Sequence, residues 1–360
     1  MTLAHRSLPG LVAATALIGR ARAETAPLEQ VAQFEQQVTG VAVAPTGRTF
    51  VNFPRWGQDV AMSVAEVMRD GTLKPYPDAG WNAWRNEKKL SNQDHFVCVQ
   101  SVTVDPQGFL WVLDPAARGN EFIVDGGPKL VKIDLGTNKV VNIIPFGRDV
   151  CPQGSYLNDV RVSPDGKTAY LTDSGIKGAL LVVDIPTHRI KRALDGVGPT
   201  QAEPDVVVMT DGKPLKRSDG RELIVAADGI ALDPKGEFLY WQALTGRTLY
   251  RAPTAVLRAG GMIKVERLGT TCVSDGYWMD KRGRLFITSP EDNSVKLRKP
   301  DGTLQIVAQD DRLRWPDSLA EGADGALFVT ASHIQDMGQW HDRGSTRTMP
   351  YGLFRFMPPA

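Results

Sequence analysis

The sequence predicts an all-β fold, a single six-bladed β-propeller with four-stranded blades around a central channel. One strand–turn–strand pattern recurs six times, which is typical of a propeller whose blades each pack between two neighbours. The 35 Gly and 24 Pro among 360 residues favour many tight turns over long helices. The copies of the pattern begin near residues 39, 100, 158, 228, 275 and 317.

Each copy has a small or polar residue, an alternating apolar strand, a turn centred on glycine and a second apolar strand. Asp228-Gly229-IALDPKG-EFLYWQA is one example. Pro or Asp just before the turn, with glycine at positive φ, is the expected chemistry of a hairpin. Segments such as Ala179-LLVVDI supply the third and fourth strands. The six turn glycines are Gly47, Gly108, Gly166, Gly236, Gly283 and Gly325.

The chain divides into a leader and one domain. Residues 1–23 have a short basic start, an uncharged apolar run and Ala21-Arg22-Ala23 as a small-x-small cleavage site, the pattern of a secretory signal peptide. The apolar run is too short to cross a bilayer. We therefore expect residues 24–360 to form one periplasmic or secreted propeller with no membrane insertion after signal cleavage.

Four stretches are too long for simple hairpin connections. The most prominent, residues 199–227, contains the hairpin signal Thr210-Asp211-Gly212-Lys213. Long loops in a compact fold often carry function. The other three are residues 84–97, 115–128 and 334–350.

Charge and motifs exclude several classes of protein. The formal net charge is +1, and removal of the leader would leave a slightly acidic protein, so nucleic-acid binding through bulk basicity is not expected. The sequence has no GxSxG elbow, no P-loop and no GxGxxG after a strand. We expect no nucleotide and no redox cofactor, and a small molecule as the partner. The sequence indicates no oligomeric state.

The three cysteines allow one intramolecular disulfide at most. Cys98 and Cys151 each precede a predicted inner strand, and export would permit their oxidation, which favours a Cys98–Cys151 pair. The alternative is that these two and Cys272 are buried thiols.

Five segments carry a resemblance to a known family: Gly47-RTFVNFPRW, Gln100-SVTVDPQGFLWVLDP, Tyr156-LNDVRVSPDGKTAYLTDSG, Asp228-GIALDPKGEFLYW and Trp315-PDSL. They resemble the major royal jelly/yellow protein family, in a bacterial-type form. The resemblance implies a six-bladed propeller, with dopachrome conversion in some members, small-amine binding in others and nutritional or signalling roles in royal jelly proteins. The starts of the repeats also resemble those of SMP-30/gluconolactonase-like propellers, which are metal-dependent lactone hydrolases.

Aligning the repeats predicts a ring of oxygen-bearing side chains at the channel mouth. Three carboxylates and an amide near one axis favour a divalent cation, Ca²⁺ above others, which could polarise a carbonyl or activate water. Without a cation, crowded carboxylates would raise one another's pKa and leave a protonated acid for proton transfer. Asp228 and Asp275 are therefore the candidate catalytic residues. The alternative is that the ring only caps strands and holds axial waters. Its members are Thr39, Gln100, Asn158, Asp228, Asp275 and Asp317.

The resemblance to the lactonases implies a metal site at Asn158, Asp228 and Asp275. Asn158 matches the Asn of that group's Asn-Asp-Gly segment, and Asp275 matches its Asp ligand. Asp228 falls where the group has an Asn ligand. Thr39 departs from the pattern, because the group has a Glu ligand there.

The ends of the second strands supply further candidates, since they finish on the face where the first strands begin. Aromatic and charged side chains together suit an amphipathic ring or an amine. The alternative for each is a rim side chain or a turn former. The ligand-binding candidates are Arg55, Trp56, Asp173, Trp241, Glu291 and His333, with Gln100 and Asp317 from the ring.

The sequence thus predicts an exported propeller that binds a small polar or aromatic molecule at the axial channel mouth. Enzymatic hypotheses are a metal-assisted, lactonase-like hydrolase or a dopachrome-type isomerase. The alternative is a non-catalytic binding protein for an amine or a sugar-derived ligand. A protein-binding scaffold is disfavoured by the ring of oxygens.

Overall fold

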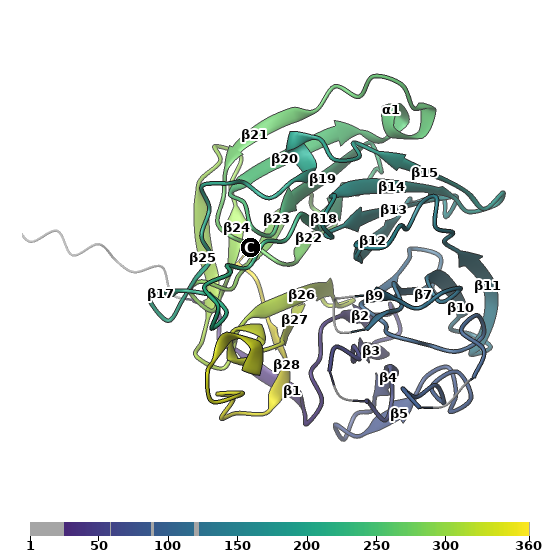
Figure 1. Cartoon of the computed structure of the whole chain (residues 1–360), viewed down its shortest axis with the longest axis horizontal. Coiled ribbons are helices and arrows are strands. Elements are labelled where there is room, and N and C mark those ends of the chain that lie inside the picture. Colours follow the sequence, from purple (N-terminus) through teal and green to yellow (C-terminus); the bar gives the residue numbers. More distant parts are fainter. Residues whose placement is uncertain (1–24, 58, 88–89, 119–121, 360) are drawn as a thin grey trace, which may run out of the picture.

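The computed structural model describes residues 25–57, 59–87, 90–118 and 122–359, so the predicted leader lies outside the described residues. Within them, the strands form six four-stranded antiparallel sheets arranged in a ring (Figure 1). The predicted all-β six-bladed propeller is confirmed. No helix in the described part of the chain is long and apolar enough to span a membrane.

Five blades use strands that follow one another along the chain, the innermost first. The first blade has β2 (Val41–Val43), β3 (Thr49–Asn52), β4 (Val64–Val67) and β5 (Leu73–Pro75). The second has β6 (Ser101–Val104), β7 (Phe109–Asp114), β10 (Lys129–Asp134) and β11 (Lys139–Pro145). The third has β12 (Leu157–Val162), β13 (Thr168–Asp173), β14 (Ala179–Asp184) and β15 (Arg189–Ala193).

The fourth and fifth blades repeat the same order. The fourth has β18 (Ala227–Leu232), β19 (Phe238–Ala243), β20 (Thr248–Pro253) and β21 (Glu266–Thr270), with helix α1 (Thr254–Ala259) after β20. The fifth has β22 (Tyr277–Met279), β23 (Leu285–Ser289), β24 (Ser294–Arg298) and β25 (Leu304–Gln309). Two short hairpins lie outside the blades: β8 (Ala117–Arg118) with β9 (Phe122–Ile123), and β16 (Met209–Thr210) with β17 (Lys213–Pro214).

The sixth blade joins the two ends of the described chain. Strands β26 (Pro316–Glu321), β27 (Leu327–Ala331) and β28 (Tyr351–Phe356) are completed by β1 (Glu29–Phe34), which pairs with β28. Figure 1 shows purple β1 beside yellow β28. Because the inner strands contact one another around the axis and β26 contacts β2, the ring is closed by hydrogen bonds and packing.

The turn chemistry expected from the repeats is present. All six predicted turn glycines have positive φ, between 69° and 84°. At Gly47 the backbone N–H donates to Ala44 O at 2.8 Å, which closes the hairpin between the first two strands of the blade. The predicted hairpin at Thr210 is also confirmed, with Asp211 and Gly212 both in the left-handed region.

The core lies between neighbouring blades rather than in one central mass. Trp111 on β7 and Leu157 on β12, for example, belong to one buried apolar cluster of the second and third blades. Each blade face is therefore covered by the next blade, and no point in the ring separates two independent domains.

The cysteine prediction needs correction. The three cysteines are buried free thiols, so the expected Cys98–Cys151 disulfide is wrong and the alternative holds. Cys98 lies between β5 and β6, and its sulfur accepts the backbone N–H of Arg55 at 3.2 Å. Cys151 packs in the cluster between the second and third blades.

Near the axis the backbones of adjacent blades approach so closely that two positions require glycine. A Cβ at Gly276 would lie 2.0 Å from Asp317 O, and one at Gly229 would lie 2.6 Å from Asp275 O. Each Gly follows an axial Asp, so an Asp-Gly pair supplies both the acid and the space for the next blade.

This contact predicts the effect of Gly276→Ala. The added methyl group overlaps a backbone oxygen that cannot move without shifting the sixth blade, so we expect a loss of about 1–3 kcal/mol in unfolding free energy, measured by urea denaturation. Gly198→Ala is the control, because a Cβ at Gly198 meets nothing within 4 Å, and its effect should stay within about 0.5 kcal/mol. Equal stability of the two variants would contradict the proposed close packing.

Candidate functional site

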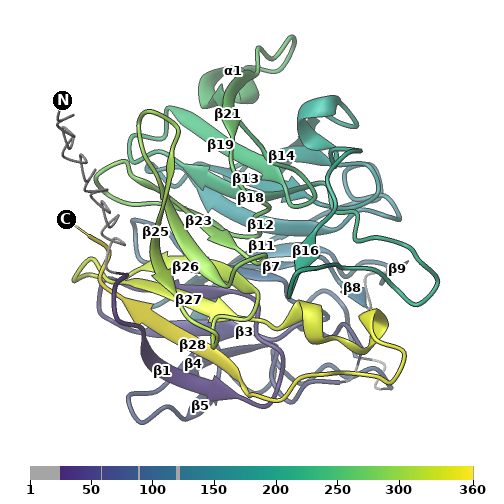
Figure 2. The same ribbon diagram turned by 90° about the vertical axis from the view of Figure 1, so that its left-hand side faces the viewer.

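A cavity of about 650 Å³ lies at the axis. Part of its wall comes from residues 201–226 and part from residues 334–340, which contain the 3-10 turns η2 (Ile334–Asp336) and η3 (Gly338–Trp340). Figure 2 shows β16 and the yellow turns on the same side of the ring. The cavity therefore opens on one face, under a cover formed by two of the predicted long loops.

Five buried polar side chains of the predicted ring form the cavity floor. They come from five successive inner-strand starts, and all line the cavity. They are Gln100, Asn158, Asp228, Asp275 and Asp317.

Backbone irregularities place three of these side chains. The pairing of β12 with β13 shifts between Leu157 and Val160, so Asn158 has no regular partner. Equivalent shifts occur around Asp228 in β18 and Asp317 in β26. Such bulges redirect side chains next to functional sites, and here they coincide with the side chains that reach the cavity.

A chain of hydrogen bonds crosses the floor. The indole N–H of Trp56 donates to Tyr156 Oη, and that hydroxyl donates to Gln100 Oε1, both at 2.6 Å. Gln100 Nε2 then donates to Asn158 Oδ1 at 3.1 Å. Asn158 Nδ2 donates to Asp228 Oδ2 at 2.6 Å. Because the chain starts at an indole N–H, which can only donate, the orientation of the Gln100 and Asn158 amide groups follows from it.

The chain continues into a hydrogen-bonded pair of carboxyl groups. Asp228 and Asp275 lie near enough to interact as a hydrogen-bonding pair, and such an interaction between two carboxyl groups needs a proton on one of them. Burial, and then the neighbouring charges of Asp275 and Asp317, raise the pKa of Asp228 well above 3.8. Burial raises the pKa of Asp275 to about 6, although an indole N–H donor opposes the shift. Asp228 is therefore the acid that holds the shared proton, and Asp275 is the one that ionises first.

Trp315 supplies the indole N–H that stabilises ionised Asp275, at 2.6 Å from Oδ2. The backbone of Trp315 is left-handed, with φ of 53°, which costs a bulky residue about 1–3 kcal/mol. The N–H of Ser332 holds the Trp315 carbonyl at 3.1 Å. The surrounding structure thus maintains a strained residue that donates to a floor carboxylate.

Asp317 completes the acidic group. Burial, and then the charge of Asp275, raise its pKa well above 3.8. Its Oδ1 accepts from Ser318 Oγ at 3.1 Å, and the Ser332 side chain is a further donor to this carboxyl group, although no hydrogen bond of standard geometry reaches its buried Oδ2. This oxygen is an acceptor available to a molecule or ion in the cavity.

The mouth of the cavity is apolar, in contrast to its floor. Ile176 and Ile224 are 90% and 74% exposed, and both line the cavity. Trp340 also lines it, with the guanidinium of Arg217 5.8 Å from its ring centroid. A molecule that fits this cavity has a polar end for the floor and an apolar part for the mouth.

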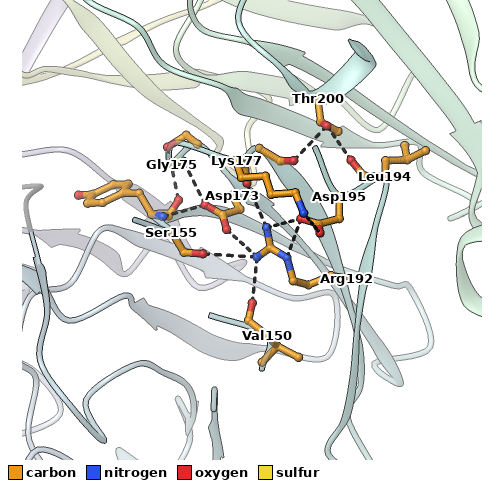
Figure 3. A network of polar contacts seen from close by, with 12 residues as sticks. Val150, Ser155, Asp173, Gly175, Lys177, Arg192, Leu194, Asp195 and Thr200 are labelled. Atoms are coloured by element: carbon orange, nitrogen blue, oxygen red, sulfur yellow. Dashed lines mark hydrogen bonds and ion pairs between the residues drawn. The ribbon is translucent and has the colours of Figure 1, made fainter. Parts of the chain in front are cut away.

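Asp173, expected as a ligand-binding residue, instead positions the cavity wall. Its fully buried carboxylate accepts the backbone N–H groups of Tyr156 at 2.7 Å and Gly175 at 3.0 Å. Arg192 donates to its second oxygen at 2.7 Å (Figure 3). The network joins two loops of the wall, so Asp173 is a positioning residue and not a cavity contact.

Arg55 and Trp241 do not reach the channel mouth, contrary to expectation. Arg55 is 1% exposed and uses its guanidinium on Asp59 and on buried carbonyls. Trp241 is fully buried, stacks on Tyr250 and donates its indole N–H to Pro199 O at 2.9 Å. Both side chains lie among packed elements, because a second strand sits behind the inner strand for most of its length.

Glu291 and His333 also lie off the cavity lining. Glu291 pairs with Arg247 at 2.7 Å and accepts the backbone N–H of Met209, which holds the β16–β17 hairpin. His333 is 2% exposed, with Nδ1 3.2 Å from Asp336. Their expected place in ligand binding is corrected to a role in attaching the cover.

Sequence reasoning missed two residues that contact the floor. Tyr156 and Trp315 each precede an axial residue by two positions, Asn158 and Asp317. Both residues directly precede the first residue of an inner strand, β12 or β26. That spacing was the available signal. The predicted residues that do line the cavity are Trp56, Gln100, Asn158, Asp228, Asp275 and Asp317.

The oxygen-bearing side chains of the floor are suitable ligands for a hard cation, but their positions do not form a metal site. In the described ranges no three His, Cys, Asp or Glu side chains meet as a metal site. Thr39 is unavailable, because its hydroxyl donates to Gln100 O at 2.9 Å and accepts from Asn52 Nδ2 at 2.8 Å. Carboxylates and an amide oxygen are suitable calcium ligands, but Asn158 presents Nδ2 to Asp228. A cation would have to replace the shared proton.

Comparisons with known proteins agree with this architecture. The sequence profile described as major royal jelly protein matches residues 97–347. No curated protein matches the sequence.

Among solved structures, the chain is similar to a gluconolactonase from Xanthomonas campestris, with 14% identity, a TM-score of 0.55 and coverage of 93% of this chain and 90% of that one. The calcium-binding protein regucalcin from Agrobacterium tumefaciens is similar with 13% identity and a TM-score of 0.57, and the match covers 93% of this chain and 94% of that one. A luciferin-regenerating enzyme is similar with 12% identity and a TM-score of 0.57, and the match covers 92% of this chain and 95% of that one. At these identities the likeness shows the propeller fold.

The shared proton predicts how Asp228→Asn changes the dependence of stability on pH. The axial acids keep their protons in the folded protein, whereas the unfolded chain releases them near pH 4. These acids therefore stabilise the folded wild type at low pH. That contribution to the unfolding free energy is lost as the pH rises through about 6, the pKa of Asp275, and beyond. The Asn amide still accepts from Asn158 and donates to Asp275 without a titratable proton. We expect its unfolding free energy to fall less than that of wild type between about pH 5 and pH 8, by about 1–3 kcal/mol.

Urea denaturation across this pH range measures the difference. Asp301→Asn makes the same substitution in an exposed turn, where the carboxylate is ionised throughout this pH range, and should follow the wild-type curve. Parallel curves for wild type and Asp228→Asn would contradict the shared proton.

Proposed function

The chain belongs to the major royal jelly protein family, and from this premise we propose that its axial cavity binds a small molecule and that Asp228 and Asp275 transfer protons to and from it. The observation that carries the proposal is the pair of buried carboxyl groups, both with raised pKa values, at the floor of an open cavity. Paired acids with different pKa values are the arrangement that acid–base catalysis needs.

The two acids have complementary roles above about pH 6. Asp275, held by the Trp315 indole, is then the carboxylate and accepts a proton. Asp228, held by the Asn158 amide, keeps its proton and donates it. The higher pKa of Asp228 supports this direction of transfer.

Two reactions use this pair without further groups. In lactone hydrolysis, Asp275 accepts a proton from the attacking water and Asp228 donates one to the ring oxygen that leaves as an alcohol. In tautomerisation of an oxidised catechol-like ring, Asp275 accepts a proton from carbon and Asp228 donates one to the carbonyl oxygen. The gluconolactonase among the similar structures supports the first reaction.

A divalent cation is an alternative to the shared proton in the hydrolase, because a cation held by Asp228 and Asp275 would displace that proton. Asn158, Asp228 and Asp275 would hold it, with Ca²⁺ the best match to oxygen ligands. Once bound, the cation would polarise the carbonyl of a lactone. The similarity to calcium-binding regucalcin supports this choice of metal.

A non-catalytic binding protein is the second candidate. The Asp317 carboxyl group on the floor and the aromatic wall favour it, because together they suit a protonated amine or a hydroxyl on a ring. In either case we propose that the protein acts in the periplasm or outside the cell, which the leader pattern of residues 1–23 supports.

Turnover by Asp228→Asn tests the catalytic proposal. The Asn side chain preserves both hydrogen bonds but has no proton to donate, so we expect kcat to fall at least about a hundredfold on δ-gluconolactone, γ-butyrolactone or dopachrome, whichever the wild type converts. The wild-type rate should fall as pH drops below about 6, where Asp275 is protonated. Asp301→Asn is the control and should keep the wild-type rate.

Full activity in Asp228→Asn would exclude the acid–base role. Quenching of tryptophan fluorescence by an amine or a sugar-derived ligand, without turnover of any of the three compounds, would support the binding protein instead.

Calcium binding is tested by thermal unfolding. Since Ca²⁺ competes with the shared proton, about 1 mM Ca²⁺ should raise the melting temperature by a few degrees near pH 8 and leave it unchanged near pH 5. Asp275→Asn should remove the shift, while Asp301→Asn should retain it. An equal shift in Asp275→Asn would place the cation elsewhere, and no shift in wild type would remove the cation from the mechanism.

A further inference from the structure

Two isoleucines at the cavity mouth are exposed to an unusual degree. Ile176, in the loop between β13 and β14, is 90% exposed, and Ile224, in the cover, is 74% exposed. They come from segments about fifty residues apart in sequence, and both line the same cavity. Large exposed apolar side chains that gather at a cavity indicate the apolar part of a bound molecule.

The backbone holds Ile176 in this place. Its N–H donates to Gly154 O at 2.9 Å, and its Cδ1 is 3.1 Å from the position of a Cβ at Gly154. The preceding Gly175 is bound to the buried carboxylate of Asp173. The loop is therefore anchored at Ile176 and at the residue before it, and Ile176 is presented at the mouth rather than folded into the core.

Thr245 fixes Ile224 in the same manner. The Thr245 hydroxyl donates to Leu223 O and accepts the N–H of Val225, both at 3.0 Å. The Thr245 N–H also donates to Val225 O at 3.1 Å. Because the residues before and after Ile224 are both held, its side chain stays at the mouth.

The cavity is also large for a simple ring compound. Its volume of about 650 Å³ lies within the range of about 300–1,000 Å³ for pockets that enclose drug-sized molecules. A five-membered lactone on the polar floor would leave the apolar mouth uncovered. An added alkyl chain would cover it.

We propose that the molecule bound in the cavity carries an apolar chain, which lies between Ile176 and Ile224 while its polar head reaches the carboxyl floor. The substrate class is then an alkyl-substituted lactone rather than a small polar lactone. This inference rests on the proposed function only for the identity of the head group.

Binding of N-phenyl-1-naphthylamine, an uncharged apolar fluorophore, tests the mouth without requiring turnover. We expect wild type to bind it and Ile176→Ser and Ile224→Ser each to raise Kd about threefold to tenfold, with a larger increase in the double variant. Met262→Ser is the matched control, because Met262 is 98% exposed and does not line the cavity, so its Kd should equal that of wild type. All three isolated changes are at exposed side chains, and equal melting temperatures check that folding is unaffected.

Displacement of the fluorophore by two lactones tests the substrate class. γ-Dodecalactone should displace it at least about a hundredfold more effectively than γ-butyrolactone, and the double variant should lose most of that difference. Absence of fluorophore binding to wild type, a double-variant Kd within twofold of wild type, or equal displacement by the two lactones would overturn the inference. Chain-dependent displacement without hydrolysis would retain it and reject the proposed catalysis.

Discussion

The close contact of neighbouring backbones at the axis governs both the fold and the site. Gly229 and Gly276 are needed because the next blade's carbonyl oxygen occupies the place of a Cβ. The residue before each glycine is an axial aspartate, Asp228 or Asp275. Packing the blades this tightly therefore brings carboxyl groups of successive blades together, and their proton sharing follows from the geometry of the ring.

Electrostatics beneath the floor strengthen the same effect. Asp159 lies next to the ring and forms an ion pair with Arg161 at 2.9 Å, and its charge contributes to the raised pKa values of Asp228 and Asp275. Arg161 also donates to Tyr277 O at 2.7 Å, which links the third blade to the fifth across the axis. The Asp159–Arg161 ion pair and the Asp228–Asp275 pair are therefore linked electrostatically, since the negative charge of Asp159 makes the loss of the shared proton less favourable.

Local sequence rules predicted the fold well because hairpin turns are local. All six turn glycines, including Gly166, adopt the positive φ that the turn chemistry requires. The axial acids could be predicted because the repeat places equivalent residues on one axis. Arg55 and Trp241 could not be placed by the same rule, because the end of a second strand faces either the cavity or a neighbouring blade, and that choice depends on partners distant in sequence.

The cover and the floor meet at one residue. Trp315 packs in the apolar cluster of the cover with Trp340 and Val208, and the same indole donates to Asp275. The cover is also attached by Arg314, which bridges Asp211 at 2.9 Å and Asp336 at 2.7 Å. The bridge to exposed Asp211 is worth little in water, whereas the Trp315 contacts are fully buried. The strained tryptophan is therefore the strongest physical link between the walls that enclose a ligand and the carboxylate that would act on it.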